Sequence, residues 1–294
     1  MTRLAWLLLL FASAARAAIS LTDDAGATLR FERPAARIVS LAPHITETLF
    51  AAGAGGKIVG AVDYSDHPEA ARKIPRIGGY SKLDLEAILA LRPDLAIGWL
   101  SGNSPAHVEK LRAAGIPVFL VQPSRIEDVA KNLERFGQLA GTGEAAQRAA
   151  SEFRTRLAAL HERHAARPKV RVFYQIWNQP LMTIGGGQII SDVIALCGGE
   201  NVFAELKALA PQVSVEAVLA ADPEVIIASG MGEARPEWLD AWRKWTGLTA
   251  VKRDNLFFIP PDLLQRPTPR LIEGAARLCE QLETARGKRP DARR

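Results

Sequence analysis

The longest helical pattern in the chain runs from Glu144 to Ala166, a stretch that contains neither glycine nor proline. Apolar side chains recur along it at steps of three and four residues, which predicts one buried stripe on an otherwise polar helix. The residues of this stripe are Ala146, Ala150, Phe153, Leu157 and Leu160. Thr142 is expected to cap the helix and Pro168 to end it. At about 1.5 Å per residue the helix is roughly 34 Å long, so it divides the chain into two parts.

The two parts that flank this helix echo each other. Residues 83–97, LDLEAILALRPDLAI, align without a gap with residues 213–227, VSVEAVLAADPEVII, which lie 130 positions further on. A single echo at that distance is not the period of a repeat array. It predicts two similar lobes, one on each side of the long helix.

Strand patterns alternate with helical patterns in both parts, which is typical of parallel sheets covered by helices on both faces. The predicted fold class is therefore α/β, with two Rossmann-like lobes that have parallel-type sheets, one long rigid α-helix between them, and a ligand cleft between the lobes. We assign residues 18–141 to the N-terminal lobe, 142–167 to the inter-lobe helix, 168–286 to the C-terminal lobe and 287–294 to a frayed basic tail.

The first 17 residues, MTRLAWLLLLFASAARA, have the composition of a secretory signal peptide. No later apolar run approaches the roughly 20 residues that a membrane span needs, and no cysteine is placed to accept a lipid. We therefore expect a soluble, exported protein without a lipid anchor. Removal of the signal peptide lowers the formal net charge from +5 to +3, so the positive charge does not indicate a nucleic-acid partner.

Both cysteines, Cys197 and Cys279, lie after the long helix. Export to an oxidising compartment is compatible with a disulfide, which would join the C-terminal lobe to its last helix. Two buried free thiols are the alternative, and the spacing leaves both open.

In open α/β sheets, ligands bind beyond the carboxyl ends of the strands. The residues that follow the expected strands are rich in aromatic and polar groups and poor in catalytic pairs; they include Tyr64, Trp99, Gln122, Trp177, Asp262 and Arg266. Such a set suits a large planar ligand held between the lobes, with Arg266 available for an anionic or amide edge. His44, near a helix start on the cleft side, could line the pocket, ligate a metal or pack at the helix end.

Catalytic and metal-binding motifs are not supported. His161 and His164 are three residues apart, whereas a zincin helix needs four, and a solvated helix face is the expected alternative. Residues 53–57, GAGGK, do not fit a P-loop, and no G-x-S-x-G elbow occurs. All five histidines lie at or before His164, so the C-terminal lobe offers none to a metal ion. We expect no enzymatic activity, cofactor or metal site.

Glu86 and Glu216 occupy the same position in the two copies of the echo. Each lies two residues after a possible helix cap, Asp84 or Ser214, where a carboxylate interacts favourably with the helix dipole. One acidic group per lobe would also suit a two-fold symmetric partner with basic residues. The residues themselves leave both explanations open.

Several segments together resemble the periplasmic cobalamin-binding proteins of ABC-type vitamin importers, which belong to the helical-backbone class of substrate-binding proteins. The segments are RIVSLAPHITETLFAAGAGGKIVGAVDYSDHPEAARKIPRIGGY, LDLEAILALRPDLAIGW, the long helix, LCGGENVF with the later Cys279, and PQVSVEAVLAADPEVII. The resemblance covers nearly all of the mature chain. It implies a periplasmic location and a rigid helix that permits only modest motion between the lobes.

The resemblance also implies roles for individual residues. Cys197 and Cys279 are expected to form a disulfide, and Glu86 and Glu216 to dock onto arginines of a membrane permease dimer. The corrinoid is expected in the cleft, where the resemblance and the position of the strands together give Tyr64, Tyr80, Trp99, Asp262, Arg266, His44 and Trp177 as binding residues.

The chain departs from the family pattern in its aromatic residues. Tyr80 and Ala210 stand where the family has tryptophan, and an aromatic residue is missing near Leu181 or Met182, a loss for which Trp177 could compensate. We therefore expect a monomeric, non-enzymatic periplasmic receptor that captures cobalamin or a related corrinoid for an ABC importer. The alternatives are the same receptor role for haem or a ferric siderophore and, in a different class, an exported enzyme.

Overall fold

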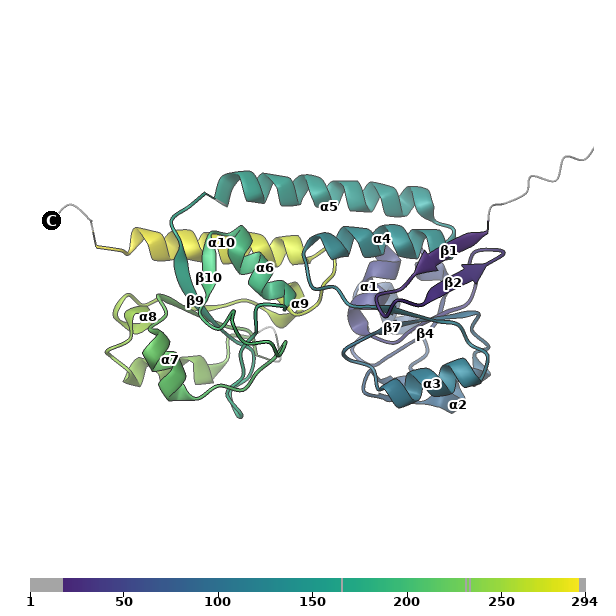
Figure 1. Ribbon diagram of the computed structural model, residues 1–294, viewed down its shortest axis with the longest axis horizontal. Coiled ribbons are helices and arrows are strands. Elements are labelled where there is room, and N and C mark those ends of the chain that lie inside the picture. Colours follow the sequence, from purple (N-terminus) through teal and green to yellow (C-terminus); the bar gives the residue numbers. More distant parts are fainter. Residues whose placement is uncertain (1–17, 165, 231, 233, 291–294) are drawn as a thin grey trace, which may run out of the picture.

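Helix α5 (Gly143–His164) runs across one face of two lobes that lie side by side (Figure 1). The structure is a computed structural model, and it describes residues 18–290 except for residues 165, 231 and 233. The predicted signal peptide, residues 1–17, lies outside the described residues. The bounds of α5 agree with the helix predicted from Glu144 to Ala166 to within two residues at each end.

The N-terminal lobe contains a four-stranded parallel sheet. Its strands are, in spatial order, β4 (Ile58–Ala61), β3 (Ile38–Ser40), β7 (Leu95–Trp99) and β8 (Val118–Val121). Helices α1 (Pro43–Ala51) and α4 (Glu127–Ala140) cover the face towards α5, and α2 (Leu85–Ala90) and α3 (Pro105–Ala113) cover the other face (Figure 1). Smaller elements are the hairpin β1 (Ile19–Thr22) and β2 (Thr28–Phe31), the pair β5 (Gly78–Gly79) and β6 (Lys82–Leu83), and the 3-10 turns η1 (Gly55–Lys57) and η2 (Glu69–Lys73).

The C-terminal lobe repeats this sheet. Its parallel strands are β10 (Gly199–Asn201), β9 (Val170–Gln175), β11 (Val225–Ala228) and β12 (Leu256–Phe258). Its helices are α6 (Ile189–Leu196), α7 (Val215–Ala221), the 3-10 helix η3 (Glu237–Lys244), α8 (Thr249–Lys252), α9 (Pro261–Leu264) and α10 (Leu271–Gly287). When the strands of each sheet are numbered in chain order, both sheets have the spatial order 2-1-3-4. The predictions of an α/β fold and of two similar lobes are confirmed.

The sequence echo corresponds to the helix that precedes the third strand of each sheet, together with that strand. Asp84 caps α2 by accepting a hydrogen bond from the Ala87 N–H at 3.0 Å, and Ser214 caps α7 in the same way at 3.1 Å. The Arg37 guanidinium donates to the carbonyl of Leu91. The Arg171 guanidinium donates to the carbonyl of Ala221, which is the position equivalent to Leu91 in the second copy of the echo. The two lobes therefore share side-chain contacts as well as topology.

Helix α5 buries the N-terminal half of its predicted stripe. Ala146, Ala150 and Phe153 are buried, whereas Leu157 and Leu160 are only partly buried. A Cβ atom on Gly137 of α4 would lie 2.2 Å from the Cβ of Ala146, so α4 and α5 pack closely there only because that residue is glycine. The buried cluster around α5 includes side chains of both lobes, which makes it one continuous core.

Two local predictions were wrong. The Thr142 hydroxyl does not cap α5; it donates to the carbonyl of Ala52 in the N-terminal lobe at 2.6 Å. The tail does not begin at residue 287 as a frayed end, because α10 continues to Gly287 and the Arg289 guanidinium binds Glu224 at 2.7 Å. The acidic partner of Arg289 lies 65 residues away, so the sequence of the tail does not reveal this charge pair.

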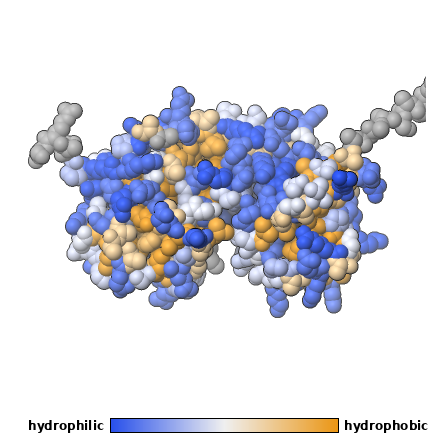
Figure 2. All heavy atoms as spheres, viewed as in Figure 1, coloured by the Kyte–Doolittle hydropathy of each residue, from blue (hydrophilic) through white to orange (hydrophobic). Residues whose placement is uncertain are grey.

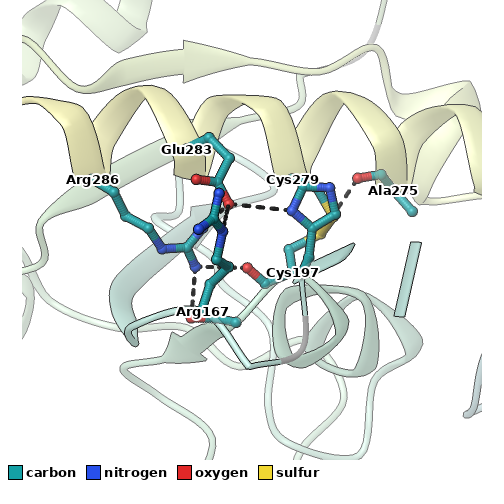
Figure 3. The surroundings of a disulfide bond; sticks show 8 residues. Arg167, Cys197, Ala275, Cys279, Glu283 and Arg286 are labelled. Carbon is teal, nitrogen blue, oxygen red and sulfur yellow. Dashed lines mark hydrogen bonds and ion pairs between the residues drawn. A yellow bond between two sulfur atoms is a disulfide. The ribbon is translucent and has the colours of Figure 1, made fainter. Parts of the chain in front are cut away.

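The end of α5 is held to the C-terminal lobe by an ionic cluster next to the disulfide (Figure 3). Glu283 of α10 accepts from Arg167 at 3.1 Å and from Arg286 at 2.8 Å, and the ring of His164 lies 3.2 Å from it. Partial burial disfavours the charged carboxylate, but these three neighbours outweigh it and lower the pKa of Glu283. His164 was expected on a solvated helix face; it is buried, because this cluster covers it.

Cys197 and Cys279 form a disulfide with an S–S distance of 2.04 Å, which confirms the predicted pairing. It joins the end of α6 to α10 within the C-terminal lobe, 82 residues apart in the chain. Within the described ranges, no helix is long and apolar enough to cross a membrane.

We predict that replacing both cysteines, as Cys197→Ser with Cys279→Ser, lowers the free energy of unfolding by about 4 kcal/mol. The reason is that the bond closes a loop of 82 residues and so restricts the unfolded chain. Urea denaturation monitored by circular dichroism measures the change. An oxidised wild-type protein with two titratable thiols, or a double variant as stable as the wild type, would contradict this prediction.

Candidate ligand-binding cleft

A cavity of about 420 Å³ lies between the two lobes. The N-terminal lobe contributes Tyr80 and Trp99, and the C-terminal lobe contributes Ile176 and Leu209. Trp99 ends strand β7 and Ile176 follows strand β9, so the cavity lies at the carboxyl ends of both sheets, where ligands of open α/β folds bind. Two larger depressions, of about 770 and 590 Å³, lie beside α6 and share Arg125; they contain no aromatic side chain other than His161.

An aromatic cluster forms the N-terminal wall of the cavity. The rings of Tyr80 and Trp99 are 5.9 Å apart, and the ring of His44 contacts Trp99 edge-on at 5.3 Å. A Cβ atom on Gly102 would lie 1.9 Å from the Trp99 ring, so the indole fits only over a glycine. The buried side chain of Asn103 accepts from the N–H of Trp99 and donates to the carbonyl of Tyr80, which fixes the two segments relative to each other.

His44 lies beneath this cluster and not in the open cavity. Burial and, to a smaller extent, the nearby charge of Arg266 lower its pKa from 6.5 to about 3, so the imidazole is neutral at physiological pH. Its Nε2 atom has no hydrogen-bond partner among the described residues. Of the three roles left open by the sequence, the geometry therefore favours packing behind the pocket wall.

Charged groups from both lobes meet beside the cavity. Arg266 lies between Asp66, at 2.9 Å, and Asp262, at 3.1 Å. Burial opposes ionisation of Asp66, but its hydrogen bond to Arg266 lowers its pKa below the ordinary value. Burial raises the pKa of Asp262. Asp66 belongs to the N-terminal lobe and the other two residues to the C-terminal lobe, so this cluster joins the lobes.

A second ionic contact reinforces the first. The Arg270 guanidinium donates two parallel hydrogen bonds of 2.7 Å to Glu47, which is 5% exposed in its side chain. The pair joins α10 to α1 across 223 residues of sequence. Removing one partner would leave the other charged and largely buried, so the pair fixes how the lobes sit relative to each other.

The remaining predicted binding residues lie outside the cavity. Tyr64 has a left-handed backbone with φ of 62° and a side chain that is 74% exposed. Trp177 is 37% exposed, and its indole N–H donates to the carbonyl of Gln179. Asp262 and Arg266 adjoin the cavity through Gln265 and the neighbouring proline, which line it. The structure therefore brings together Tyr80 and Trp99, with His44, Asp262 and Arg266 close by.

Several residues of the cleft were not predicted from the sequence. These are Glu47 and Arg270 of the inter-lobe ion pair, Asn103, and the cavity-lining Gln188, Leu209 and Gln265. Gln265 lies one residue before Arg266, and its position after strand β12 was a signal that could have identified it. The others depend on contacts between segments more than 20 residues apart.

Glu86 and Glu216 lie far from the cavity wall, in the first turns of α2 and α7. Both helices lie on the side of the molecule away from α5 (Figure 1), and the gap between the lobes opens on the same side (Figure 2). Both side chains are exposed. Hydrogen bonds from its own backbone N–H and from Ser214 lower the pKa of Glu216, so that carboxylate is charged and accessible.

Comparisons with known proteins identify the class. A family model described as a periplasmic binding protein matches residues 38–263. A vitamin B12-binding protein of Vibrio campbellii is 38% identical over 257 residues, which cover 87% of this chain and 92% of that protein. A vitamin B12-binding protein of Yersinia pestis is 37% identical over 248 residues, covering 84% and 86%. The chain belongs to the periplasmic binding protein family.

Solved structures agree with this assignment. The crystal structure of the periplasmic vitamin B12-binding protein BtuF of Vibrio cholerae has a TM-score of 0.79 and 38% identity, and the match covers 86% of this chain and 98% of that one. A periplasmic heme-binding protein from Pseudomonas aeruginosa has a TM-score of 0.72 and 28% identity, covering 83% and 91%. The resemblance to periplasmic cobalamin-binding proteins is therefore confirmed, and the fold is shared with haem binders. In the described part of the chain, no group of three or more His, Cys, Asp or Glu side chains could hold a metal ion.

We predict that His44 makes folding sensitive to acid. Between pH 6.5 and about 3 the unfolded chain binds a proton at this position that the folded chain does not, so the free energy of unfolding falls as pH falls. The slope is at most about 1.4 kcal/mol per pH unit. A His44→Phe variant should lose less stability than the wild type when urea denaturation is repeated from pH 7 to pH 4. Parallel curves for the two proteins would show that His44 does not titrate in this way.

Proposed function

We propose that this protein is a periplasmic receptor that captures cobalamin or a related corrinoid in the inter-lobe cavity and delivers it to an ABC-type importer. The aromatic cavity at the carboxyl ends of the two sheets is the observation on which this proposal rests. The vitamin B12-binding relatives, at 37 to 39% identity over most of both chains, support it. In this proposal residues 1–17 export the chain, residues 18–141 and 168–286 act as lobes on the helix 142–167, and the receptor is monomeric and non-enzymatic.

The wall of Tyr80 and Trp99 supplies flat apolar surface against which a macrocycle can lie. The exposed ring of Tyr64 would extend this surface beyond the cavity, and its strained backbone supports such a role, because left-handed tyrosine is uncommon without a functional reason. Asp262 and Arg266 would contact polar groups at the ligand's edge. Trp177 would contribute a further exposed ring from the C-terminal lobe.

Haem is the second candidate ligand, because a heme-binding protein shares the fold at 28% identity. Haem receptors need an axial ligand that reaches the iron. His44 is poorly placed for this, since it is 6% exposed and lies edge-on against Trp99. An exposed tyrosine such as Tyr64 would have to serve instead. A ferric siderophore is a further candidate ligand, and titration with a ferric hydroxamate tests it.

We predict that the mature protein, residues 18 onward, binds cyanocobalamin one-to-one in a calorimetric titration with submicromolar affinity. Hemin and a ferric hydroxamate, titrated under the same conditions, should give no saturable heat. Saturation by hemin or the hydroxamate and silence with cyanocobalamin would contradict the corrinoid proposal while retaining a receptor role.

We predict that a Trp99→Ala variant binds cyanocobalamin more weakly than the wild type. Loss of the indole should weaken cyanocobalamin binding by at least about tenfold, because stacking area and the packing over His44 are both lost. Leu89→Ala, a change to an exposed apolar residue on α2 outside the cavity, is the matched variant and should bind as the wild type does. Equal affinities in the two variants would remove Trp99 from the site.

We also propose that Glu86 and Glu216 form the docking contacts with the permease. Each stands at the N-terminus of a short helix, one per lobe (Figure 1), on the side where the gap between the lobes opens (Figure 2). Two equivalent carboxylates fit a permease dimer that offers one basic site per subunit. As exposed carboxylates they stabilise their helices only weakly through the helix dipole, too little for the two positions to be needed for folding.

We predict that Glu86→Ala together with Glu216→Ala abolishes most corrinoid uptake in a reconstituted transport assay while cyanocobalamin affinity stays within about twofold of the wild type. Glu109→Ala, at an exposed carboxylate on α3 of the N-terminal lobe, is the control and should leave uptake unchanged. A double variant that loses ligand affinity would assign the glutamates to the pocket or the fold instead.

A further inference from the structure

Apart from Tyr80 and Trp99, the polar side chains that line the inter-lobe cavity in the described part of the chain are neutral hydroxyl and amide groups. They are Ser101, Gln122, Gln188 and Gln265. Three glutamines on one small cavity come from three separate segments, after β8, before α6 and after α9. Their hydrogen bonds decide what each amide can offer to a ligand.

Two of these glutamines are oriented by the backbone. The Gln122 Oε1 accepts from the N–H of Ser101 at 3.0 Å, and the Gln188 Oε1 accepts from the N–H of Ile190 at 2.5 Å, where it caps α6. A backbone N–H can only donate, so the bound atom in each side chain must be the oxygen. Each Nε2 group is then left as a donor, and neither donates to another described residue.

Gln265 is placed differently from the other two glutamines. Its Nε2 is buried and lies beside the buried hydroxyl of Tyr174. Burial raises the pKa of that tyrosine, and the neighbouring amide of Gln265 opposes this rise. The Gln265 amide nitrogen therefore faces Tyr174 and not the open cavity.

Arg266, which follows the cavity-lining Gln265, is already neutralised. Arg266 contacts both Asp66 and Asp262, and Arg270 is engaged with Glu47. Among the described residues that line the cavity there are N–H donors but no arginine or lysine, and two carboxylates lie nearby. A ligand carboxylate buried there would lose its water and meet negative charge, whereas a neutral amide would not.

We propose that Gln122 and Gln188 form a donor site that binds carbonyl oxygens on the ligand's periphery and selects a neutral, amide-bearing macrocycle over one that bears carboxylates. This inference rests on the proposed function, since a corrinoid carries primary amides where haem carries two carboxylates. It assigns ligand selection to these two neutral side chains in addition to the aromatic wall.

The test compares cyanocobalamin with its monocarboxylic derivatives, in which one peripheral amide is hydrolysed and the ring is unchanged. The wild-type protein should bind at least one of these isomers about tenfold more weakly than the amide near pH 7. This preference should shrink near pH 4, where the carboxyl group becomes protonated. Equal affinity for the amide and for every acid would overturn the inference.

Gln122→Glu and Gln188→Glu keep an oxygen for the backbone N–H but replace the donor with an anion. Each should increase the preference for amide over carboxylate about tenfold further, because the new charge repels the acid and cannot donate to it. Gln147→Glu, on the exposed side of α5, is the matched control and should leave the preference unchanged. An unchanged preference in both cavity variants would also overturn the inference.

Failure of the inference is distinguishable from failure of the proposed function. A wild-type protein that binds cyanocobalamin but does not distinguish it from the acids retains the receptor role and loses only the donor site. A wild-type protein that does not bind cyanocobalamin loses both.

Discussion

Helix α5 packs Ala146, Ala150 and Phe153 into a buried cluster that contains side chains of both lobes. Because this core is continuous, the lobes cannot separate or rotate freely without exposing apolar surface, at a cost of roughly 25 cal/mol per Å². The pair of Arg270 with Glu47 and the cluster around Arg266 add directional contacts on the cleft side. The cavity therefore exists at a defined width before any ligand arrives.

A preformed cavity has consequences for recognition. Its aromatic wall is held by Asn103 and Gly102, and two of its three glutamines are oriented by backbone N–H groups. Little conformational entropy would be lost when a rigid macrocycle enters such a site, which favours affinity. The charged residues that join the lobes also neutralise one another, and the described residues that line the cavity include neutral amides but no arginine or lysine.

The fold could be predicted closely from the sequence, because strand and helix patterns alternate clearly and the echo of residues 83–97 revealed the second lobe. The candidate site could be predicted only in part. Tyr80 and Trp99 line the cavity, and Trp99 was predicted as a binding residue from its position at the end of a strand. Gln188 and Leu209 lie in loops without a periodic pattern, so nothing local indicated that they face the cleft. The tail prediction failed because the partner of Arg289 is Glu224, 65 residues away.

The sequence by itself determined the α/β class, the two-lobed division about a long helix and the relation to periplasmic cobalamin-binding proteins. These follow from local periodicity, from an ungapped internal echo and from family-specific segments. Only the tertiary structure decided that His44 is buried behind Trp99, that Arg266 is neutralised by carboxylates of both lobes, and that three glutamines converge on one cavity. Burial and charge pairing arise between residues distant in the chain, so no local pattern encodes them.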